Sequence, residues 1–222
     1  MEYYNNSQLT PLALATFALG LFWEAEARFG ILPGVERTRV GFTGGETRNP
    51  SFLAPGDQYE ALEITFRPSV VSYETLLKCF WENHNAAIRA HSRRYASAIF
   101  YHDGAQRAAA IASKLRMQQE RGAIFSTEIL PFTFFYQAED HHQKYYLNRF
   151  PELITELTAN RPDHTALVRS TALARVNGYL AGFGTREEVA RNLASYGLSP
   201  TWRDTVMRIG GFERRVPAIP DI

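Results

Sequence analysis

The feature that most constrains this chain is the alternation of strand-like and helix-like hydrophobic patterns over its first 160 residues. Apolar runs bounded by Gly or Pro predict strands at 12–19, 35–42, 60–66, 95–101 and 127–130. Apolar residues at helical spacing predict helices at 22–29, 72–81, 103–121 and 138–147. The elements do not follow a regular βαβ spacing, so they indicate an α+β fold with a mixed or antiparallel sheet and flanking helices.

A different pattern begins near residue 158. Helical patterns at 166–180, 186–196 and 202–209 follow one another, and no strand pattern separates them. We therefore expect two parts: an α+β domain over 1–157 and an all-helical C-terminal extension over 158–222 that packs on it.

The charge balance excludes several classes of protein. The 222 residues contain 24 Lys and Arg against 23 Asp and Glu, whereas a general nucleic-acid binder needs a basic excess. No apolar run approaches the roughly 20 residues that span a bilayer, and the first residues lack the positive region of a secretory signal. We expect a cytoplasmic protein that binds neither nucleic acid nor membrane.

Cysteine and histidine usage gives no sign of a metal site. The single cysteine, Cys79, excludes an intrachain disulfide and a cysteine-rich zinc site. Counted at 100° per residue it lies away from the apolar stripe of its helix, so we expect a structural or bystander role. The adjacent His141 and His142 would diverge on a helix, and the other histidines lack ligand spacing. We expect no metal and no cofactor.

A resemblance to one family adds to this reading. Gly20-Leu-Phe-Trp23, between a predicted strand and a predicted helix, resembles the Gly-Cys-Phe-Trp signature of the methionine sulfoxide reductase A family. The likeness continues in family order to about residue 157, through Gly41-Phe-Thr-Gly-Gly45, Phe80-Trp-Glu-Asn-His84, Tyr95-Ala-Ser-Ala-Ile99, and Ala138-Glu139 with His142-Gln143. It implies that family's ferredoxin-like α+β fold.

The resemblance also implies a chemistry. In that family a cysteine at the N-terminus of the first helix attacks the sulfoxide sulfur, and the helix dipole favours its thiolate. A carboxylic acid protonates the departing oxygen, two tyrosines and an acidic residue position that oxygen, and a Phe-Trp pair encloses the S-methyl group. Further thiols, usually with thioredoxin, then reduce the sulfenic acid.

Part of this machinery has a counterpart in the chain. Phe22 and Trp23 match the aromatic cage, Glu60 matches the acid, and Tyr95 matches one oxygen-binding tyrosine. Glu60 and Tyr95 are thus the candidate catalytic groups. The candidate substrate-binding residues are Leu21, Phe22, Trp23, Glu24, Phe52, Glu60, Tyr95 and His142.

Other parts are missing. Leu21 occupies the nucleophile position, Phe52 the place of the second tyrosine, Ala90 the acidic position, and Glu24 the place of a small residue. Leucine has no atom that can attack sulfur, so we expect the standard reductase chemistry to be absent. A long-tailed plant branch of the family also replaces the cysteine, and its tail contains an Asn-Gly-Tyr sequence that Asn177-Gly-Tyr179 resembles.

Each candidate also has a structural interpretation. Glu60 lies either in the pocket or on the solvated face of its strand, because alternation alone allows both. Phe22 and Trp23 either face a ligand or belong to the core. His142, three residues after Glu139, is expected to form a structural hydrogen bond behind the site.

Four functions stay open at this level. The first is a binder of a small methyl, thioether or sulfoxide ligand, or of a methionine-containing peptide, in the retained aromatic pocket. The second is a non-thiol enzyme in which Glu60 and Tyr95, with Glu24 as a second carboxylate, perform acid–base chemistry. The third is a residual peptide-methionine (S)-S-oxide reductase that uses Cys79 or an external thiol. The fourth is a scaffold whose C-terminal helices dock a protein partner.

Overall fold

The computed structural model describes residues 11–159 and 166–211. The first ten residues, whose charge entered the argument about a secretory signal, lie outside the described part, as do 160–165 and 212–222. Within the described residues, no helix is both long and apolar enough to cross a lipid bilayer.

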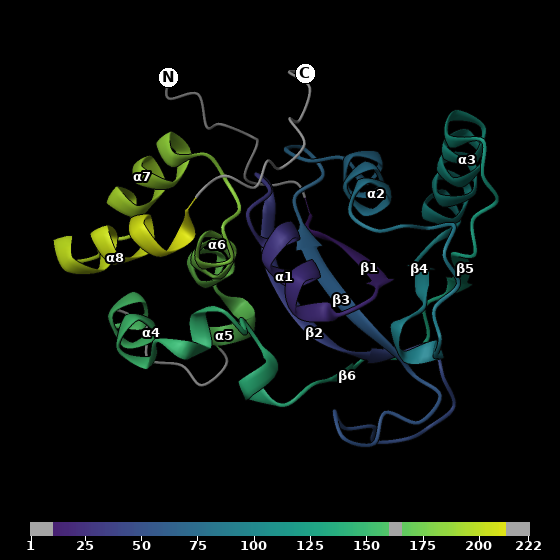
Figure 1. Ribbon diagram of the computed structural model, residues 1–222, viewed down its shortest axis with the longest axis horizontal. Helices are drawn as coiled ribbons and strands as arrows, with labels where there is room; N and C mark the ends of the chain where they lie inside the picture. Colours follow the sequence, from purple (N-terminus) through teal and green to yellow (C-terminus); the bar gives the residue numbers. More distant parts are fainter. Residues whose placement is uncertain (1–10, 160–165, 212–222) are drawn as a thin grey trace.

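A six-stranded mixed sheet forms the centre of the fold (Figure 1). Its spatial order is β5-β4-β1-β3-β2-β6, and every neighbouring pair is antiparallel except β4 and β5. The strands are β1 (Ala13–Leu19), β2 (Val35–Thr43), β3 (Tyr59–Phe66), β4 (Ser97–Tyr101), β5 (Glu128–Pro131) and β6 (Tyr136–Gln137). The expected α+β class with a mixed sheet and flanking helices is confirmed.

Three helices pack on one face of this sheet. They are α1 (Phe22–Gly30), α2 (Tyr73–Glu82) and α3 (Gly104–Arg121), and their apolar sides share one core with β1, β2 and β3. Local signals set their ends: the side chains of Ser72 and Asp103 accept backbone N–H groups at the starts of α2 and α3. Gly122 ends α3 with a left-handed φ of 60°.

The segment 138–147, expected as a helix, forms instead a pair of short 3₁₀ turns, Asp140–His142 and Leu147–Arg149. Lys144 between them has a φ of 50°, which an α-helix does not allow. Its side chain is fully buried and binds the Glu26 carboxylate of α1 and the Thr38 carbonyl of β2. The Lys144 backbone N–H also donates to Glu26, over 2.7 Å. These tertiary bonds replace the helical ones that local periodicity predicts.

Two other boundaries differ from the expectation. The strand expected at 95–101 begins at Ser97, because Arg93–Tyr95 form a 3₁₀ turn. The helix expected at 166–180 divides into α5 (Ala166–Arg169) and α6 (Thr171–Leu180). Ser170 separates them, and its hydroxyl accepts the Leu173 N–H and so caps α6.

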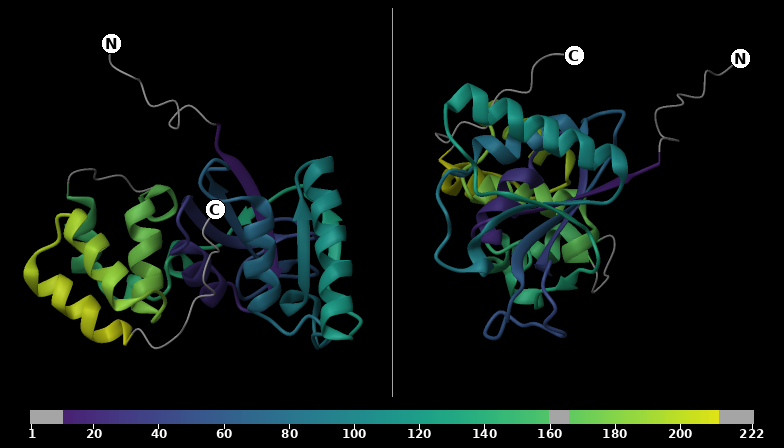
Figure 2. Two further views of the ribbon diagram at one scale, coloured as in Figure 1. Left: turned by 90° about the horizontal axis from the view of Figure 1, so that it is seen from above. Right: turned by 90° about the vertical axis from the view of Figure 1, so that its right-hand side faces the viewer.

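The C-terminal helices pack beside the sheet domain (Figure 2). They are α4 (Pro151–Thr158), α5, α6, α7 (Arg186–Ser195) and α8 (Pro200–Gly210). Ala27 and Ile31, from α1 and its C-terminal end, share a second core with Leu153, Val176 and other apolar side chains of these helices. The boundary at 157 stays a prediction.

The Asn177-Gly-Tyr179 sequence makes the contact between α6 and α1. A Cβ at Gly178 would overlap the Ala27 carbonyl oxygen and the Ile31 side chain. Asn177 Oδ1 accepts the backbone N–H groups of residues 146 and 147, at 3.0 and 3.2 Å. The buried Tyr179 hydroxyl accepts Nδ2 of Asn192 over 2.7 Å. Asn177 and Gly178 therefore join the extension to the sheet domain, whereas Tyr179 joins α6 to α7.

We expect Gly178→Ala to lower the free energy of unfolding by about 1–3 kcal/mol, because the added methyl group forces α6 away from α1. Urea denaturation followed by circular dichroism measures the change. Gly104→Ala is the matched control, since its Cβ would meet nothing within 4 Å in the first turn of α3; it should change the value by less than about 1 kcal/mol. Equal effects of the two changes would contradict a tight α1–α6 contact.

Candidate functional site

The candidate site lies where β1 ends and α1 begins. Leu21 is the residue preceding α1, its backbone is extended, and its side chain is 51% exposed. The first helical N–H group, that of Phe22, donates to Oε2 of Glu60 over 3.3 Å. The helix N-terminus that favours an anion therefore faces the carboxylate of a neighbouring strand.

Glu60 is completely buried on β3, which rules out the solvated-face interpretation. Its Oε1 accepts Nε of Arg94 over 2.6 Å, forming an ion pair whose arginine side chain is 18% exposed. Burial raises the pKa of the Glu60 carboxyl, and the hydrogen bonds from Arg94 and from the Phe22 N–H oppose that shift. Sequence reasoning missed Arg94, although it found that Ala90, four residues earlier, occupies the family's acidic position.

Aromatic rings gather beside this ion pair. Trp23 stacks on Tyr145 with centroids 4.2 Å apart and on Phe52 at 5.5 Å. Phe52 also lies 4.1 Å from the ring of His142 and 6.2 Å from that of Phe22. The expected cage residues are thus brought together. Phe22 is at the same time part of the core, with 1% of its surface exposed.

Tyr95 and Glu24 stand at the margin of this group. The Tyr95 ring centroid lies 5.1 Å from Cζ of Arg94, so Tyr95 contacts the site through the Arg94 guanidinium. Glu24 is half exposed and forms an ion pair with Arg28 along α1, at 2.9 Å. The Glu24 carboxylate therefore pairs within its own helix and does not serve as a second carboxylate of the site.

His142 is buried, but the hydrogen bond expected to Glu139 is not formed. Nε2 of His142 lies 3.9 Å from Oε2 of Glu139, beyond hydrogen-bond distance. Oε1 of Glu139 instead accepts the backbone N–H of Phe52, at 3.3 Å. Burial lowers the pKa of His142, and the neighbouring His141 and Arg94 lower it further. Among the described residues, no group of three or more His, Cys, Asp or Glu side chains is placed to hold a metal ion.

Cys79 corrects a sequence expectation. It does not lie away from the packed side of α2 but is 5% exposed within the main core. It shares that core with side chains of α1 and the sheet, and the charge of Arg28 on α1 acts on its thiol. Burial raises the pKa of the thiol to about 12, which leaves almost no thiolate near neutral pH.

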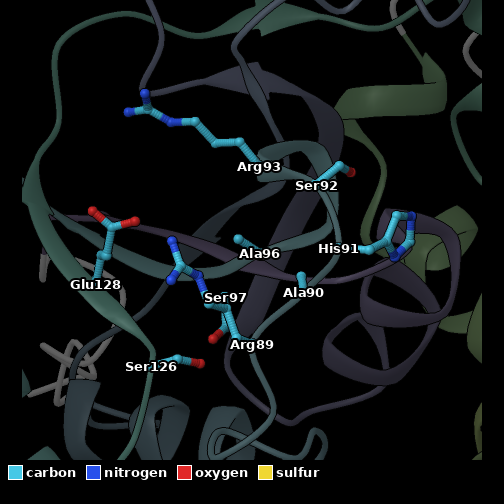
Figure 3. Close-up of a pocket in the computed structure, with 9 residues that line it drawn as sticks. All are labelled: Arg89, Ala90, His91, Ser92, Arg93, Ala96, Ser97, Ser126 and Glu128. Atoms are coloured by element: carbon cyan, nitrogen blue, oxygen red, sulfur yellow. The ribbon is translucent and has the colours of Figure 1, made fainter.

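A polar cavity of about 880 Å³ is lined by residues 89–93 together with Ser97, Ser126 and Glu128 (Figure 3). Figure 3 shows the Arg89 guanidinium directed toward Glu128 across it, with His91 directed away. Glu128 accepts the Tyr59 hydroxyl at 2.6 Å, and Arg93 donates to a backbone carbonyl at 2.9 Å. Two of its charged groups therefore already have partners within the protein.

Comparison with known proteins agrees with this architecture. The family model described as peptide methionine sulfoxide reductase matches residues 13–171. The chain belongs to the peptide methionine sulfoxide reductase family. A Drosophila melanogaster protein with that name is 42% identical over 193 residues, which are 86% of this chain and 77% of the fly protein.

Two further proteins that are similar to this reductase homologue are a plant relative and a yeast protein of known structure. Peptide methionine sulfoxide reductase A5 of Oryza sativa is 36% identical over 173 residues, 75% of this chain and 67% of the rice protein. The crystal structure of reduced Mxr1 from Saccharomyces cerevisiae superposes with a TM-score of 0.58 at 25% identity. That match covers 64% of this chain and 87% of the yeast chain.

We expect Arg94→Met to destabilise the protein by about 3–5 kcal/mol at pH 7.5, because it leaves a buried carboxylate without its partner. The pKa of Glu60 in the folded variant rises further above its ordinary value of 4.5. Folding then takes up a proton, so the loss of stability should shrink as pH falls to 4.5. Urea denaturation at both pH values measures this dependence.

The matched control is Arg116→Met, since Arg116 and Glu120 form a largely exposed ion pair at 4.0 Å. This change should cost less than about 1 kcal/mol at both pH values. A pH-independent loss in Arg94→Met would show that Glu60 does not carry the effect.

The buried thiol gives a separate prediction. Iodoacetamide should modify Cys79 at least about a hundredfold more slowly in the native protein than in denaturant, because the raised pKa suppresses the thiolate. Mass spectrometry of timed samples measures both rates. Comparable rates would contradict the burial of this residue.

Proposed function

We propose that this member of the family binds a small methyl-bearing ligand, a sulfoxide or thioether, free or within a methionine-containing peptide, and does not reduce it by thiol chemistry. The observation that carries the proposal is Leu21 at the N-terminus of α1, beside a retained aromatic site. The relatives named above are peptide methionine sulfoxide reductases, and their names supply the ligand class.

The absence of a nucleophile supports the first half of the proposal. A leucine side chain offers no electron pair to a sulfoxide sulfur, and covalent catalysis needs an activated nucleophile within bonding reach. Cys79 is an unsuitable substitute, because its thiol is buried in the main core and burial raises its pKa to about 12.

The apolar surroundings support the second half. Trp23, Phe52 and Tyr145 form a stacked aromatic group, and the half-exposed Leu21 adds an aliphatic surface at its margin. Pockets that bind small apolar ligands combine such walls with a few polar groups that fix orientation. The ion pair of Arg94 and Glu60 supplies those polar groups here.

Acid–base catalysis by Glu60 and Glu24 is less favoured. Glu60 accepts hydrogen bonds from Arg94 and from the Phe22 N–H, and Glu24 is paired with Arg28. Burial raises the pKa of Glu60, which suits a general acid, but each of its two oxygen atoms is already held by a donor of the protein. Docking of a protein partner on the C-terminal helices stays a prediction.

We expect no reduction of methionine S-sulfoxide or of a sulfoxide-containing peptide with dithiothreitol or thioredoxin as reductant. The protein should be purified from a host without its own reductases, and product measured by chromatography. Cys79→Ser should give the same background rate as the native sequence. Turnover that this change abolishes would overturn the proposal.

Binding is tested separately by titration with dimethyl sulfoxide and methionine S-sulfoxide, followed by the NMR signals of aromatic side chains. We expect saturable shifts at millimolar ligand concentrations, centred on the ring signals of Phe22 and Trp23. Leu53→Ala, on a 92% exposed position of the neighbouring loop, is the control and should bind unchanged. No shift at high millimolar concentration would exclude this function.

A further inference from the structure

Unpaired buried nitrogen atoms gather around the Phe52 ring. In the described part of the chain, seven buried side-chain nitrogen or oxygen atoms lack a hydrogen-bond partner. Four of the seven belong to three residues of the candidate site, Trp23 (Nε1), Arg94 (Nη2) and His142 (Nδ1 and Nε2). Buried polar groups are normally paired, so such a concentration requires an explanation.

All three residues are in contact with Phe52. Its ring centroid lies 4.3 Å from Cζ of Arg94, 4.1 Å from the His142 ring and 5.5 Å from the Trp23 ring. A phenyl ring cannot accept these N–H groups as an oxygen atom does. It occupies the space beside these three residues without pairing any of the four nitrogen atoms.

Phe52 is placed to move. It lies in the loop that joins β2 to β3, which projects below the sheet in Figure 1. The neck of this loop is fixed by Asp57, whose carboxylate accepts the backbone N–H groups of Glu46 and Thr47 at 2.9 Å each. At the tip, the backbones of Ser51 and Ala54 bond each other at 3.1 and 3.3 Å, and the Phe52 N–H donates to Oε1 of Glu139 at 3.3 Å. A compact loop with a firm neck can rearrange at its tip alone.

The charges around the site restrict what could replace the ring. A free anion would meet the carboxylates of Glu60 and Glu139, and a free cation would meet the guanidinium of Arg94. Trp23 Nε1 and Arg94 Nη2 are donors only, so the ligand must bring an acceptor. A net-neutral molecule with a strongly negative oxygen and a methylated, positively polarised centre satisfies both conditions. Aromatic faces attract such a centre.

We propose that Phe52 is a displaceable cover, and that the subsite beneath it takes methylated molecules with a dipolar oxygen, amine N-oxides as well as sulfoxides. This inference rests on the proposed function, because it assigns the polar end of the same site. It adds a ligand class and gives Arg94, Trp23 and His142 the role of oxygen-binding groups.

The indole N–H signals of the three tryptophans provide the test. Trimethylamine N-oxide is titrated into the full chain, with two probes of similar size as controls: tetramethylammonium, which is a cation without an oxygen, and methanesulfonate, which has oxygens but a net negative charge. The Trp23 signal, assigned by Trp23→Phe, should move downfield and saturate with the N-oxide only. The Trp81 indole, which already donates to Ser113 at 3.0 Å, should not move.

Two variants on the same loop sharpen the result. Phe52→Ala removes the cover and should lower the Kd for the N-oxide about tenfold, because no ring has to be displaced. Leu53→Ala is the matched control and should leave the Kd unchanged, since this side chain is almost fully exposed.

The outcomes separate the two proposals. If dimethyl sulfoxide binds and the N-oxide leaves the Trp23 signal in place, the inference is wrong and the proposed function stands. If neither ligand binds the native protein or Phe52→Ala, both are wrong. Equal movement of all three indole signals, or equal binding of tetramethylammonium, also overturns the inference, because the donors are then not used.

Discussion

The buried ion pair between Glu26 and Lys144 fixes the segment that follows β6 against α1 and β2. The Glu26 carboxylate of α1 binds both the side chain and the backbone N–H of Lys144, whose ammonium also donates to β2. Both side chains are fully buried, so loss of either partner would leave an uncompensated charge in the core. The pair thereby fixes an irregular segment that a helix would otherwise fill, and this segment carries His142 and Tyr145 to the candidate site.

The same segment connects the site to the C-terminal helices. Asn177 accepts two of its backbone N–H groups, and Gly178 allows α6 to approach α1 closely. Contacts therefore link α1 to Lys144, the segment around Lys144 to α6, and α6 back to α1. The helices after residue 150 complete a core that α1 begins, so they are part of the same packing arrangement as the candidate site.

At the N-terminus of α1, Arg94 balances the negative charge of Glu60. The helix N-terminus and this guanidinium both bind the Glu60 carboxylate, at 3.3 and 2.6 Å. In a protein where a thiolate used the helix N-terminus, the same region would hold a second negative charge. Replacement of the nucleophile by Leu21 and pairing of the acid with Arg94 are therefore electrostatically consistent with each other. Together they support the proposal that this site binds a ligand without reacting with it.

The sequence by itself determined most of the strands and helices and indicated the family, because hydrophobic periodicity and the Gly-Leu-Phe-Trp segment are local signals. It also identified Leu21 and the aromatic positions. Only the tertiary structure decided that 138–147 is not a helix, that Cys79 is buried and that Arg94 holds Glu60. Each of these depends on partners distant in sequence: Glu26 for the segment, the core shared with α1 for Cys79, and β3 for Arg94. Local patterns record the preference of a segment for a conformation, whereas burial and ion pairing are set by whichever distant segment packs against it.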